Sequence, residues 1–300
     1  MAEAERIAIV GLGLIGGSLA LALRRALPGL RIIGVDDDPR PREQALEERA
    51  VDAATAPEDA PLDVCDLVVL ATPAQALLTM LPKVAARMRP GAVLTDVCGA
   101  KELICAAGAA QDRVAFVGGH PMAGTEYRGF VAATPALFDG CTVALCPSVG
   151  APVEGAAAKV RALWTSAGAE KILDVDAAVH DRAVTFASHL PYLGAAAVVD
   201  ALLAAGDVAP LARELAAGGF RDTTRLAGDG TLGGAAALNR FMPQAARALA
   251  ERLRLFAAQL ENDPFVILQR LSELSEERRQ MRMPAVTPTS SVPGVPIRRR

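Results

Sequence analysis

Seven short apolar runs alternate with longer helix-forming stretches in the first part of the chain. The runs occupy residues 6–10, 31–35, 66–70, 92–96, 114–118, 141–145 and 171–175. Most of them are continuously apolar rather than alternating, which is typical of parallel strands that are buried on both faces. We therefore predict βαβ units in an α/β Rossmann-type doubly wound sheet over residues 1–175.

After residue 175 the pattern changes to long stretches rich in Ala and Leu. These stretches cover residues 177–205, 208–217, 235–260 and 264–280. In the third, Ala246, Leu249, Leu253 and Phe256 recur at a helical step, which predicts a helix with one buried face. We expect an all-α domain over residues 176–282. Four prolines and three terminal arginines predict a disordered tail over residues 283–300.

Composition narrows the class of protein. The net charge of the 300 residues is -3 and 22% of them are charged, so a basic surface for nucleic acid is not expected. The five cysteines lack zinc-finger spacing, which favours a reduced, cytoplasmic protein without a metal site.

Membrane segments are not expected either. The apolar run 7–23 follows Glu3 and Glu5 where a signal peptide needs positive charge, and four glycines interrupt it. The run 195–205 is shorter than the roughly 20 residues that a bilayer span requires.

Directly after the first predicted strand, Gly11, Gly13 and Gly16 have the spacing G-x-G-x-x-G, and a helix-forming stretch follows. Gly11 would permit the tight turn, Gly13 would let a pyrophosphate approach the backbone, and Gly16 would let the helix pack against the strand. Asp36 ends the second strand 20 residues after Gly16, where an acid binds a ribose 2′-hydroxyl. This arrangement predicts NAD rather than NADP. The predicted cofactor site comprises Gly11, Gly13, Leu14, Ile15, Gly16, Asp36 and Thr72.

The chain has three histidines. His120 follows the fifth predicted strand, and doubly wound sheets bind ligands at the carboxyl ends of their strands, so we interpret it as the catalytic residue. His180 and His189 would point to opposite sides of an unbroken helix, because nine steps of about 100° make two and a half turns. Of these two, His189 is the better candidate for the cleft. A structural hydrogen bond is at least as good an explanation for His180, which adjoins Asp181.

Arg221 and Arg225 lie one helical turn apart in the segment GGFRDTTRLAGDG. Two guanidinium groups on one face suit a substrate that carries a carboxylate. A solvated pair balanced by Asp222 and Glu214 explains the spacing equally well.

Together these motifs resemble the prephenate dehydrogenases, including their arogenate-using relatives. The resemblance rests on GLGLIGGS (11–18), TDVCGAK (95–101), GGHPMAGTE (118–126), HD (180–181), SHLPY (188–192) and GGFRDTTRLA (218–227). It implies the monofunctional form of the enzyme, a homodimer formed through the helical domain, and NAD-dependent oxidative decarboxylation of prephenate to 4-hydroxyphenylpyruvate in tyrosine biosynthesis.

The resemblance also implies roles for single residues. His120 would take the proton of the substrate hydroxyl, and Arg225 would bind a substrate carboxylate. The other implied substrate-binding positions are His189, Thr125, Glu126, Tyr192 and Gly99.

Two positions depart from the commoner family pattern. Many relatives have a serine in place of Gly99, and a histidine in place of Tyr192. Arogenate and 4-amino-4-deoxyprephenate therefore remain alternative substrates. Another Rossmann-plus-helical hydroxyacid dehydrogenase is less favoured, because such enzymes commonly use a lysine in the helical domain and no lysine follows Lys171. A non-catalytic NAD-binding regulator is the remaining alternative.

Overall fold

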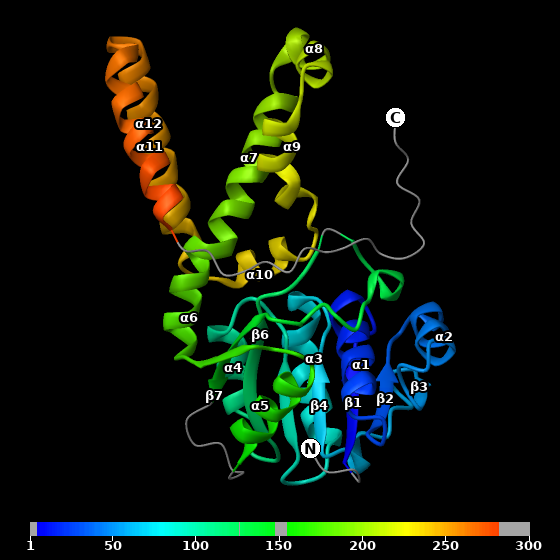
Figure 1. Ribbon diagram of the computed structural model, residues 1–300. Helices are drawn as coiled ribbons and strands as arrows, with labels where there is room; N and C mark the ends of the chain where they lie inside the picture. Colours follow the sequence, from blue (N-terminus) through cyan, green and yellow to red (C-terminus); the bar gives the residue numbers. More distant parts are fainter. Residues whose placement is uncertain (1–4, 126, 148–154, 282–300) are drawn as a thin grey trace.

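An eight-stranded sheet forms the centre of the first domain in the computed structural model (Figure 1). The structure describes residues 5–125, 127–147 and 155–281. The strands are β1 Arg6–Val10, β2 Arg31–Val35, β3 Ala53–Thr55, β4 Leu67–Leu70, β5 Val93–Asp96, β6 Ala115–Pro121, β7 Thr142–Pro147 and β8 Lys171–Asp174. Their order is β3-β2-β1-β4-β5-β6-β7-β8. The predicted doubly wound sheet is confirmed, and its chain order reverses at β1, which lies between β2 and β4.

The sheet differs from the prediction in two places. Strand β3 was not predicted, because this three-residue edge strand has no long apolar run. Strand β7 pairs with β6 in the antiparallel direction, so the expectation of parallel strands throughout is wrong. A parallel return needs a long crossover, usually an α-helix. Between β6 and β7 the described residues form only the short 3-10 helix η2, Phe130–Ala132.

Helices cover both faces of the sheet. They are α1 Leu14–Ala26, α2 Pro39–Glu47, α3 Ala74–Arg87, α4 Glu102–Ala109 and α5 Ala156–Ser166, with the 3-10 turn η1 Leu62–Val64. One buried cluster packs α1 and α5 against the sheet through residues such as Leu19 and Trp164. A second packs α3 and α4 through residues such as Leu77 and Ile104. Apolar burial on both faces explains why most strands read as continuous apolar runs.

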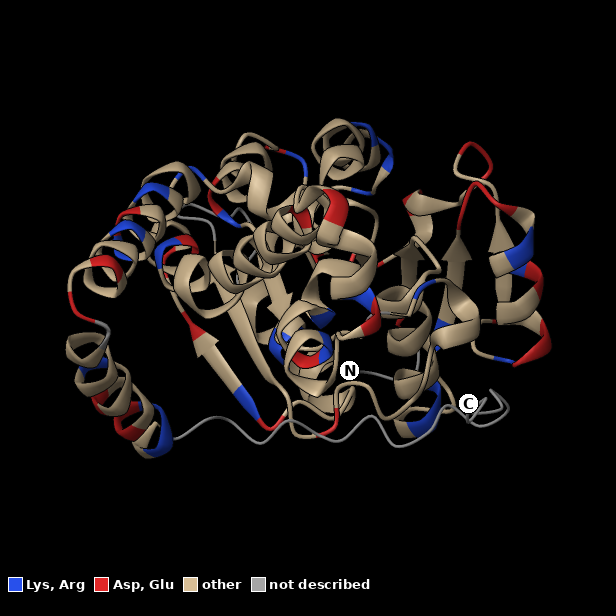
Figure 2. Cartoon of the chain, turned by 90° about the horizontal axis from the view of Figure 1, so that it is seen from above, with Lys and Arg blue, Asp and Glu red and all other residues tan. Residues whose placement is uncertain are grey.

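The second domain is helical, as predicted. Its elements are α6 Ala177–Val184, η3 Thr185–His189, α7 Leu190–Leu203, η4 Gly206–Val208, α8 Ala209–Glu214, α9 Gly218–Thr224, η5 Arg225–Gly228, α10 Leu232–Leu238, α11 Met242–Asn262 and α12 Pro264–Gln280. In Figure 1, α7 with α8 and α9 forms one arm and α11 with α12 a second, while α10 lies across the end of the sheet. In Figure 2, acidic and basic residues are interspersed over the described chain.

The predicted helix over residues 235–260 is interrupted after Leu238. The Asn239 side chain accepts a hydrogen bond from the Phe241 amide at 3.0 Å, and Pro243 occupies the first turn of α11. Local side-chain bonds of this kind compete with helical ones. The predicted buried face of α11 is only partly covered within one chain, since Leu253 is 58% exposed. The predicted tail lies outside the described residues.

The helix Ala177–Leu203 runs through α6, η3 and α7 for 27 residues. Its length and mean hydropathy would suffice to cross a membrane, and only 11% of its most apolar window is buried in the chain. The sequence predicted a helical stretch over residues 177–205 but weighed only the shorter run 195–205 as a possible membrane span. The helix carries His180, Asp181, Thr185 and His189 as buried polar residues, which places its first half against the rest of the protein.

Candidate active site

The glycine-rich turn joins β1 to α1 as predicted. Gly11 has a φ of +97°, which glycine adopts without strain, and a Cβ there would lie 2.6 Å from the Ala71 carbonyl oxygen. A Cβ on Gly16 would overlap the Gly11 carbonyl oxygen. By contrast, a Cβ on Gly13 would meet nothing within 4 Å. Glycine at positions 11 and 16 therefore allows neighbouring backbone segments to pack closely. Glycine at position 13 leaves the backbone accessible from outside.

Polar groups converge on this turn. Gly13 caps α1, so the amides of Leu14 and Ile15 lie in the first helical turn, where amides lack intrahelical partners and attract anions. Thr72 follows β4, the neighbour of β1. Its hydroxyl is buried and has no hydrogen-bond partner among the described residues. An unsatisfied hydroxyl beside an anion-binding turn fits a bound dinucleotide.

Asp36 also lies at this turn. Its carboxylate accepts hydrogen bonds from the amides of Leu12 at 2.7 Å and Asp38 at 3.0 Å. Burial raises the pKa of Asp36, while these two hydrogen bonds oppose the rise. Arg40, a cation four residues after Asp36, is paired with Asp38 at 2.7 Å. Because Arg40 is already paired, the 2′-phosphate of NADP would have no obvious partner at this residue.

His120 stands near the carboxyl end of β6, within the strand rather than after it. Its Nδ1 lies 2.9 Å from Nε2 of His180, and Nδ1 of His180 lies 2.8 Å from Oδ1 of Asp181. The amides of Lys101 and Glu102 also donate to the Asp181 carboxylate, at 2.7 and 3.0 Å. These contacts connect three side chains in series, from Asp181 and His180 in the helical domain to His120 at the end of the sheet.

The chemistry of these groups fixes the tautomers of both histidines. A carboxylate only accepts, so His180 donates from Nδ1 and accepts at Nε2. His120 must then donate from Nδ1, which leaves the lone pair on its Nε2. Burial opposes ionisation of Asp181, yet hydrogen bonds from His180, Glu102 and Lys101 hold its pKa below the usual value.

Burial lowers the pKa of His120 well below 6.5, and electrostatic interactions with His180, Lys101 and His189 lower it further. The His120 imidazole is therefore neutral near pH 7, with Nε2 ready to accept a proton.

His189 belongs to the same cluster. The Asn239 amide nitrogen lies 3.1 Å from its Nδ1 and also 2.8 Å from the Asp181 carbonyl oxygen. Nδ1 accepts this bond, so the proton of the neutral ring is on Nε2. That atom is buried and has no partner in the described part of the chain. Burial lowers the pKa of His189 to about 4, so it is a neutral donor.

The premise of an unbroken α-helix between His180 and His189 is wrong. Residues Thr185–His189 form a π-helical turn, and Pro191 follows in the first turn of α7. A π turn accommodates a proline without ending the helix, and it changes the angle between side chains before and after it. Both histidines consequently lie in one cluster. Sequence reasoning weighted His180 toward a structural role, and the adjacent His-Asp pair was the available signal for its place beside His120.

Gly99 lies against the catalytic candidate. A Cβ on Gly99 would be 3.4 Å from Nε2 of His120 and 3.2 Å from Cβ of Ala235 on α10. Two residues earlier on α10, a Cβ on Gly233 would lie 2.9 Å from the Tyr192 hydroxyl. Helix α10 thus borders both positions that depart from the family pattern.

The two arginines do not share one helix. Helix α9 ends at Thr224, and Arg225 begins the 3-10 turn η5. The Arg221 side chain is 79% exposed and pairs with Asp222 at 3.2 Å, which agrees with the alternative of a solvated arginine balanced by Asp222.

The sequence did not single out Arg128. Its guanidinium lies so close to Gly230 that a Cβ on Gly230 would overlap it. In Figure 1 the chain after β6 rises to the segment before α10. Thr125 follows β6 by four residues, and its hydroxyl accepts a hydrogen bond from the Tyr127 amide at 3.2 Å, whereas Glu126 lies outside the described residues.

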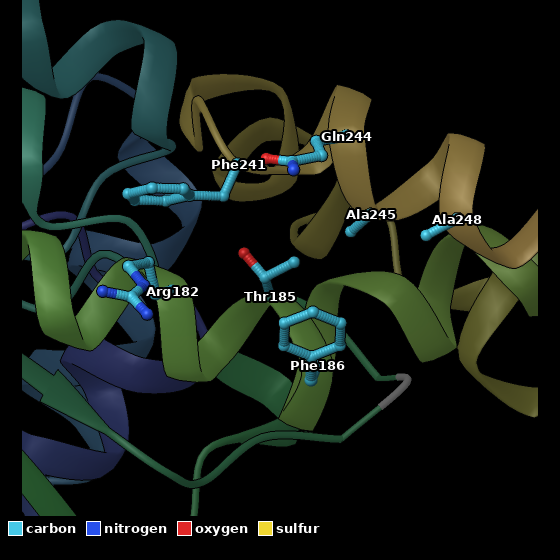
Figure 3. Close-up of a pocket in the computed structure, with 7 residues that line it drawn as sticks. All are labelled: Arg182, Thr185, Phe186, Phe241, Gln244, Ala245 and Ala248. Atoms are coloured by element: carbon cyan, nitrogen blue, oxygen red, sulfur yellow. The ribbon is translucent and has the colours of Figure 1, made fainter.

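A separate pocket lies between η3 and the start of α11 (Figure 3). Its lining residues are Arg182, Thr185, Phe186, Phe241, Gln244, Ala245 and Ala248. None of the predicted site residues lines it. Within the described ranges, no group of three or more His, Cys, Asp or Glu is arranged to hold a metal ion.

Comparison with known proteins gives matches along most of the chain. The family described as "Prephenate dehydrogenase, nucleotide-binding domain" matches residues 19–173, and "Prephenate dehydrogenase, dimerization domain" matches residues 176–269. The prephenate dehydrogenase of Bacillus subtilis is 33% identical over 226 residues, which is 74% of this chain. The chain spans about 60% of the length of that relative and of the Lactococcus lactis prephenate dehydrogenase.

Two solved structures cover nearly all of the fold. Synechocystis arogenate dehydrogenase is 34% identical with a TM-score of 0.73, covering 91% of this chain and 98% of that one. Prephenate dehydrogenase from Aquifex aeolicus, in complex with hydroxyphenyl propionate and NAD+, is 26% identical with a TM-score of 0.81, covering 92% and 97%.

Proposed function

The chain belongs to the prephenate dehydrogenase family, and we propose that it oxidises prephenate with NAD and with loss of the ring carboxylate. The product is then 4-hydroxyphenylpyruvate, an intermediate of tyrosine biosynthesis. The observation that carries this proposal is the unprotonated Nε2 of His120, held beside Gly99 at the carboxyl edge of the sheet by His180 and Asp181.

The turn at Gly11–Gly16 supports a dinucleotide. Gly13 leaves room for a pyrophosphate, the amides of Leu14 and Ile15 face its charge, and the Thr72 hydroxyl lacks another partner. Asp36, directly after β2, would bind a ribose hydroxyl. When bound, NAD supplies the acceptor for the hydride that leaves C4 of the substrate ring.

Proton transfer falls to His120. As the C4 hydride leaves, the C4 hydroxyl loses its proton to Nε2 of His120 and becomes a carbonyl. The C1–carboxylate bond then breaks, its electron pair moves through the ring to the C4 oxygen, and carbon dioxide departs. The phenolate oxygen that results takes up one proton, from the His120 imidazolium or from water, to give the phenol of the product. The imidazolium that forms keeps its hydrogen bond to His180, whose Nδ1 remains bonded to the Asp181 carboxylate. This chain stabilises the charge without moving atoms.

The substrate has two carboxylates, and Arg225 and Arg128, from two different segments, are the groups that we assign to bind them. Arg225 begins η5, and Arg128 lies against Gly230, five residues further along. Guanidinium groups bind carboxylates in a bidentate fashion. The buried Nε2–H of His189 adds a neutral donor. A few placed groups thus bind a dianion although the protein has a net negative charge.

Arogenate is the second candidate substrate. The Synechocystis arogenate dehydrogenase has the higher identity of the two structures compared, and Gly99 lacks the serine hydroxyl that many relatives place beside the substrate. The test compares kcat/KM for prephenate, arogenate and 4-amino-4-deoxyprephenate by NADH formation. Prephenate is expected to give the highest value. A higher value for arogenate would replace prephenate, and no turnover of any cyclohexadienyl acid would refute the enzyme assignment.

We also assign the exposed apolar surface of the helical domain to a second copy of the chain. Leu253 on α11 and Leu203 on α7 are 58% and 55% exposed, and the domain matches one described as a dimerization domain. The polar residues buried on Ala177–Leu203 belong to the site, which argues against a lipid environment for that helix. Light scattering coupled to size exclusion should give twice the chain mass, and a monomer at all concentrations would contradict this assignment.

A further inference from the structure

Lys101 is fully buried beneath the proposed active site. Its side chain and that of Asp96 are both 0% exposed, and the two form an ion pair. Lysine is almost never fully buried unless it is paired. Burial opposes protonation of Lys101, but Asp96 raises its pKa above the usual value, so the ammonium group remains charged.

This ion pair holds the peptide group that precedes His120. The Lys101 ammonium donates to the Gly119 carbonyl at 2.9 Å, and the Gly119 amide donates to Asp96 at 3.2 Å. The same carboxylate accepts from the Cys98 amide at 2.8 Å. Gly119 thus has both of its backbone polar groups bonded to one ion pair. The fit is close, since a Cβ on Gly119 would lie 2.6 Å from the Asp96 carbonyl oxygen.

Lys101 also contacts Asp181, which lies at the far end of the series of hydrogen bonds that begins at His120. Its backbone amide donates to Oδ1 of Asp181 at 2.7 Å, and that same oxygen lies 2.8 Å from Nδ1 of His180. One residue therefore contacts the sheet domain through its side chain and the helical domain through its backbone. A purely stabilising role is a weaker explanation for the buried Lys101–Asp96 pair, because a buried ion pair often contributes no more to stability than apolar residues of similar volume.

We propose that Lys101 is a positioning residue for proton transfer: with Asp96 it fixes the backbone of His120, and through its amide it fixes Asp181. The catalytic part of this inference rests on the proposed function. The geometric part does not, because it concerns the protein without substrate. Misplacing a reacting group by about 1 Å can cost about 100-fold in rate, so a residue that holds both His120 and Asp181 in place can affect the rate strongly.

The charged and titratable groups around His120 come from four elements. They are His180 and Asp181 on α6, His189 on η3, Asp96 at the end of β5 and Lys101 before α4. Of these, the Lys101 ammonium is a permanent positive charge near the imidazole. Removing it should make the protonated form of His120 easier to reach.

The test is the double substitution Lys101→Met with Asp96→Asn, which removes both charges at nearly constant volume. Lys83→Met, on the exposed surface of α3, is the matched control. With three histidines in the chain, nitrogen NMR of histidine-labelled protein reports each tautomer and each titration without substrate. We expect His120 and His180 to lose their single tautomers and His120 to titrate at higher pH in the double variant only. We also expect kcat to fall about 100-fold with KM for NAD unchanged, and the acidic limb of kcat/KM to move to higher pH.

Unchanged histidine signals and an unchanged acidic limb in the folded double variant would overturn the inference. If that variant does not fold, Asp96→Asn alone is measured for the histidine tautomers and for kcat, because it removes the carboxylate that binds the Gly119 amide and the Lys101 ammonium while it leaves the lysine charge in place. The unsubstituted protein offers a further check, since the Gly119 amide should exchange hydrogen as slowly as the core of the sheet, and fast exchange would also overturn the proposal. Failure of the wild-type protein to turn over any cyclohexadienyl acid would refute the proposed function while leaving the histidine NMR result decisive for Lys101.

Discussion

Nδ1 of His120 and Nε2 of His180 lie 2.9 Å apart, and this contact joins the sheet domain to the helical domain. The first ring is on β6 and the second on α6, 60 residues further along the chain. Because Asp181 sets the tautomer of His180, and His180 sets that of His120, a residue on the helical domain determines which nitrogen of His120 accepts a proton.

Replacing His120 with Asn should abolish most of the activity. Asparagine keeps a polar side chain of similar size but has no basic nitrogen, so kcat should fall by about 100-fold to 10,000-fold, the usual range for loss of a general base. Binding of NAD, measured by fluorescence titration, should hardly change, because the cofactor site that we propose is the turn at Gly11–Gly16. Equal activity would remove His120 from the mechanism.

Replacing Asp181 with Asn should lower kcat while leaving KM for NAD unchanged. The amide no longer requires His180 to donate from Nδ1, so both histidines can exchange tautomers and Nε2 of His120 is unprotonated for only part of the time. Histidine NMR together with steady-state kinetics checks this expectation. Asp222→Asn, at a position that is 75% exposed, is the control. A wild-type rate with Asn at residue 181 would show that the orientation of His180 does not matter.

Replacing Arg225 or Arg128 with Ala should raise KM for the acid substrate more than it lowers kcat. A charge-assisted hydrogen bond contributes about 1.5–3 kcal/mol, which corresponds to roughly a 10- to 150-fold change in affinity. Arg221→Ala is the control, because Arg221 is exposed and paired with Asp222. An equal KM in the control and in the Arg225 variant would count against a carboxylate-binding role.

Replacing Gly99 with Ser should improve turnover of an acid with a hydroxyl at C4. The new hydroxyl would lie near Nε2 of His120, where it can hydrogen-bond the substrate oxygen. One such bond contributes about 1 kcal/mol, or about fivefold in kcat/KM for prephenate. Gly99→Ala adds the carbon without the hydroxyl and separates the hydrogen bond from the close contact with Ala235. A gain that is equal in both variants would contradict this explanation.

Stability should fall as the pH is lowered from 6.5 toward 4. The pKa of His120 lies well below 6.5 in the folded protein and that of His189 is about 4, so the unfolded chain binds more protons in this range. The linkage slope is at most about 1.4 kcal/mol per pH unit for each histidine. Urea unfolding at several pH values measures it. In a His189→Gln variant the slope should be smaller, and an equal slope would show that His189 is not buried as a neutral ring.

Local patterns predicted much of the fold. The seven apolar runs became strands, and only the three-residue β3 was missed. Gly11 and Gly16 have the close contacts that their spacing indicated, and Gly13 has open space beside it, because the turn they form is a local structure. The direction of β7 was predicted wrongly, since strand direction depends on the path of the connecting chain rather than on the strand itself.

The candidate site was only partly predictable. His120 could be singled out because it follows the strand predicted over residues 114–118. Lys101 was not proposed as a site residue, because the sequence does not show that its ammonium group is buried. The helical phase between His180 and His189 was also misjudged, because a π turn that accommodates Pro191 is not visible in the apolar periodicity.

The sequence by itself determined which residue types were present and which of them followed strands or began helices, since hydrophobic periodicity and turn chemistry act over a few neighbouring residues. Only the tertiary structure decided that His180 meets His120, that Lys101 holds both Gly119 and Asp181, and that Gly99 faces Nε2 of His120. These contacts join residues up to 80 positions apart. They form because packing the helical domain on the sheet buries polar groups, and each buried group must then find a partner.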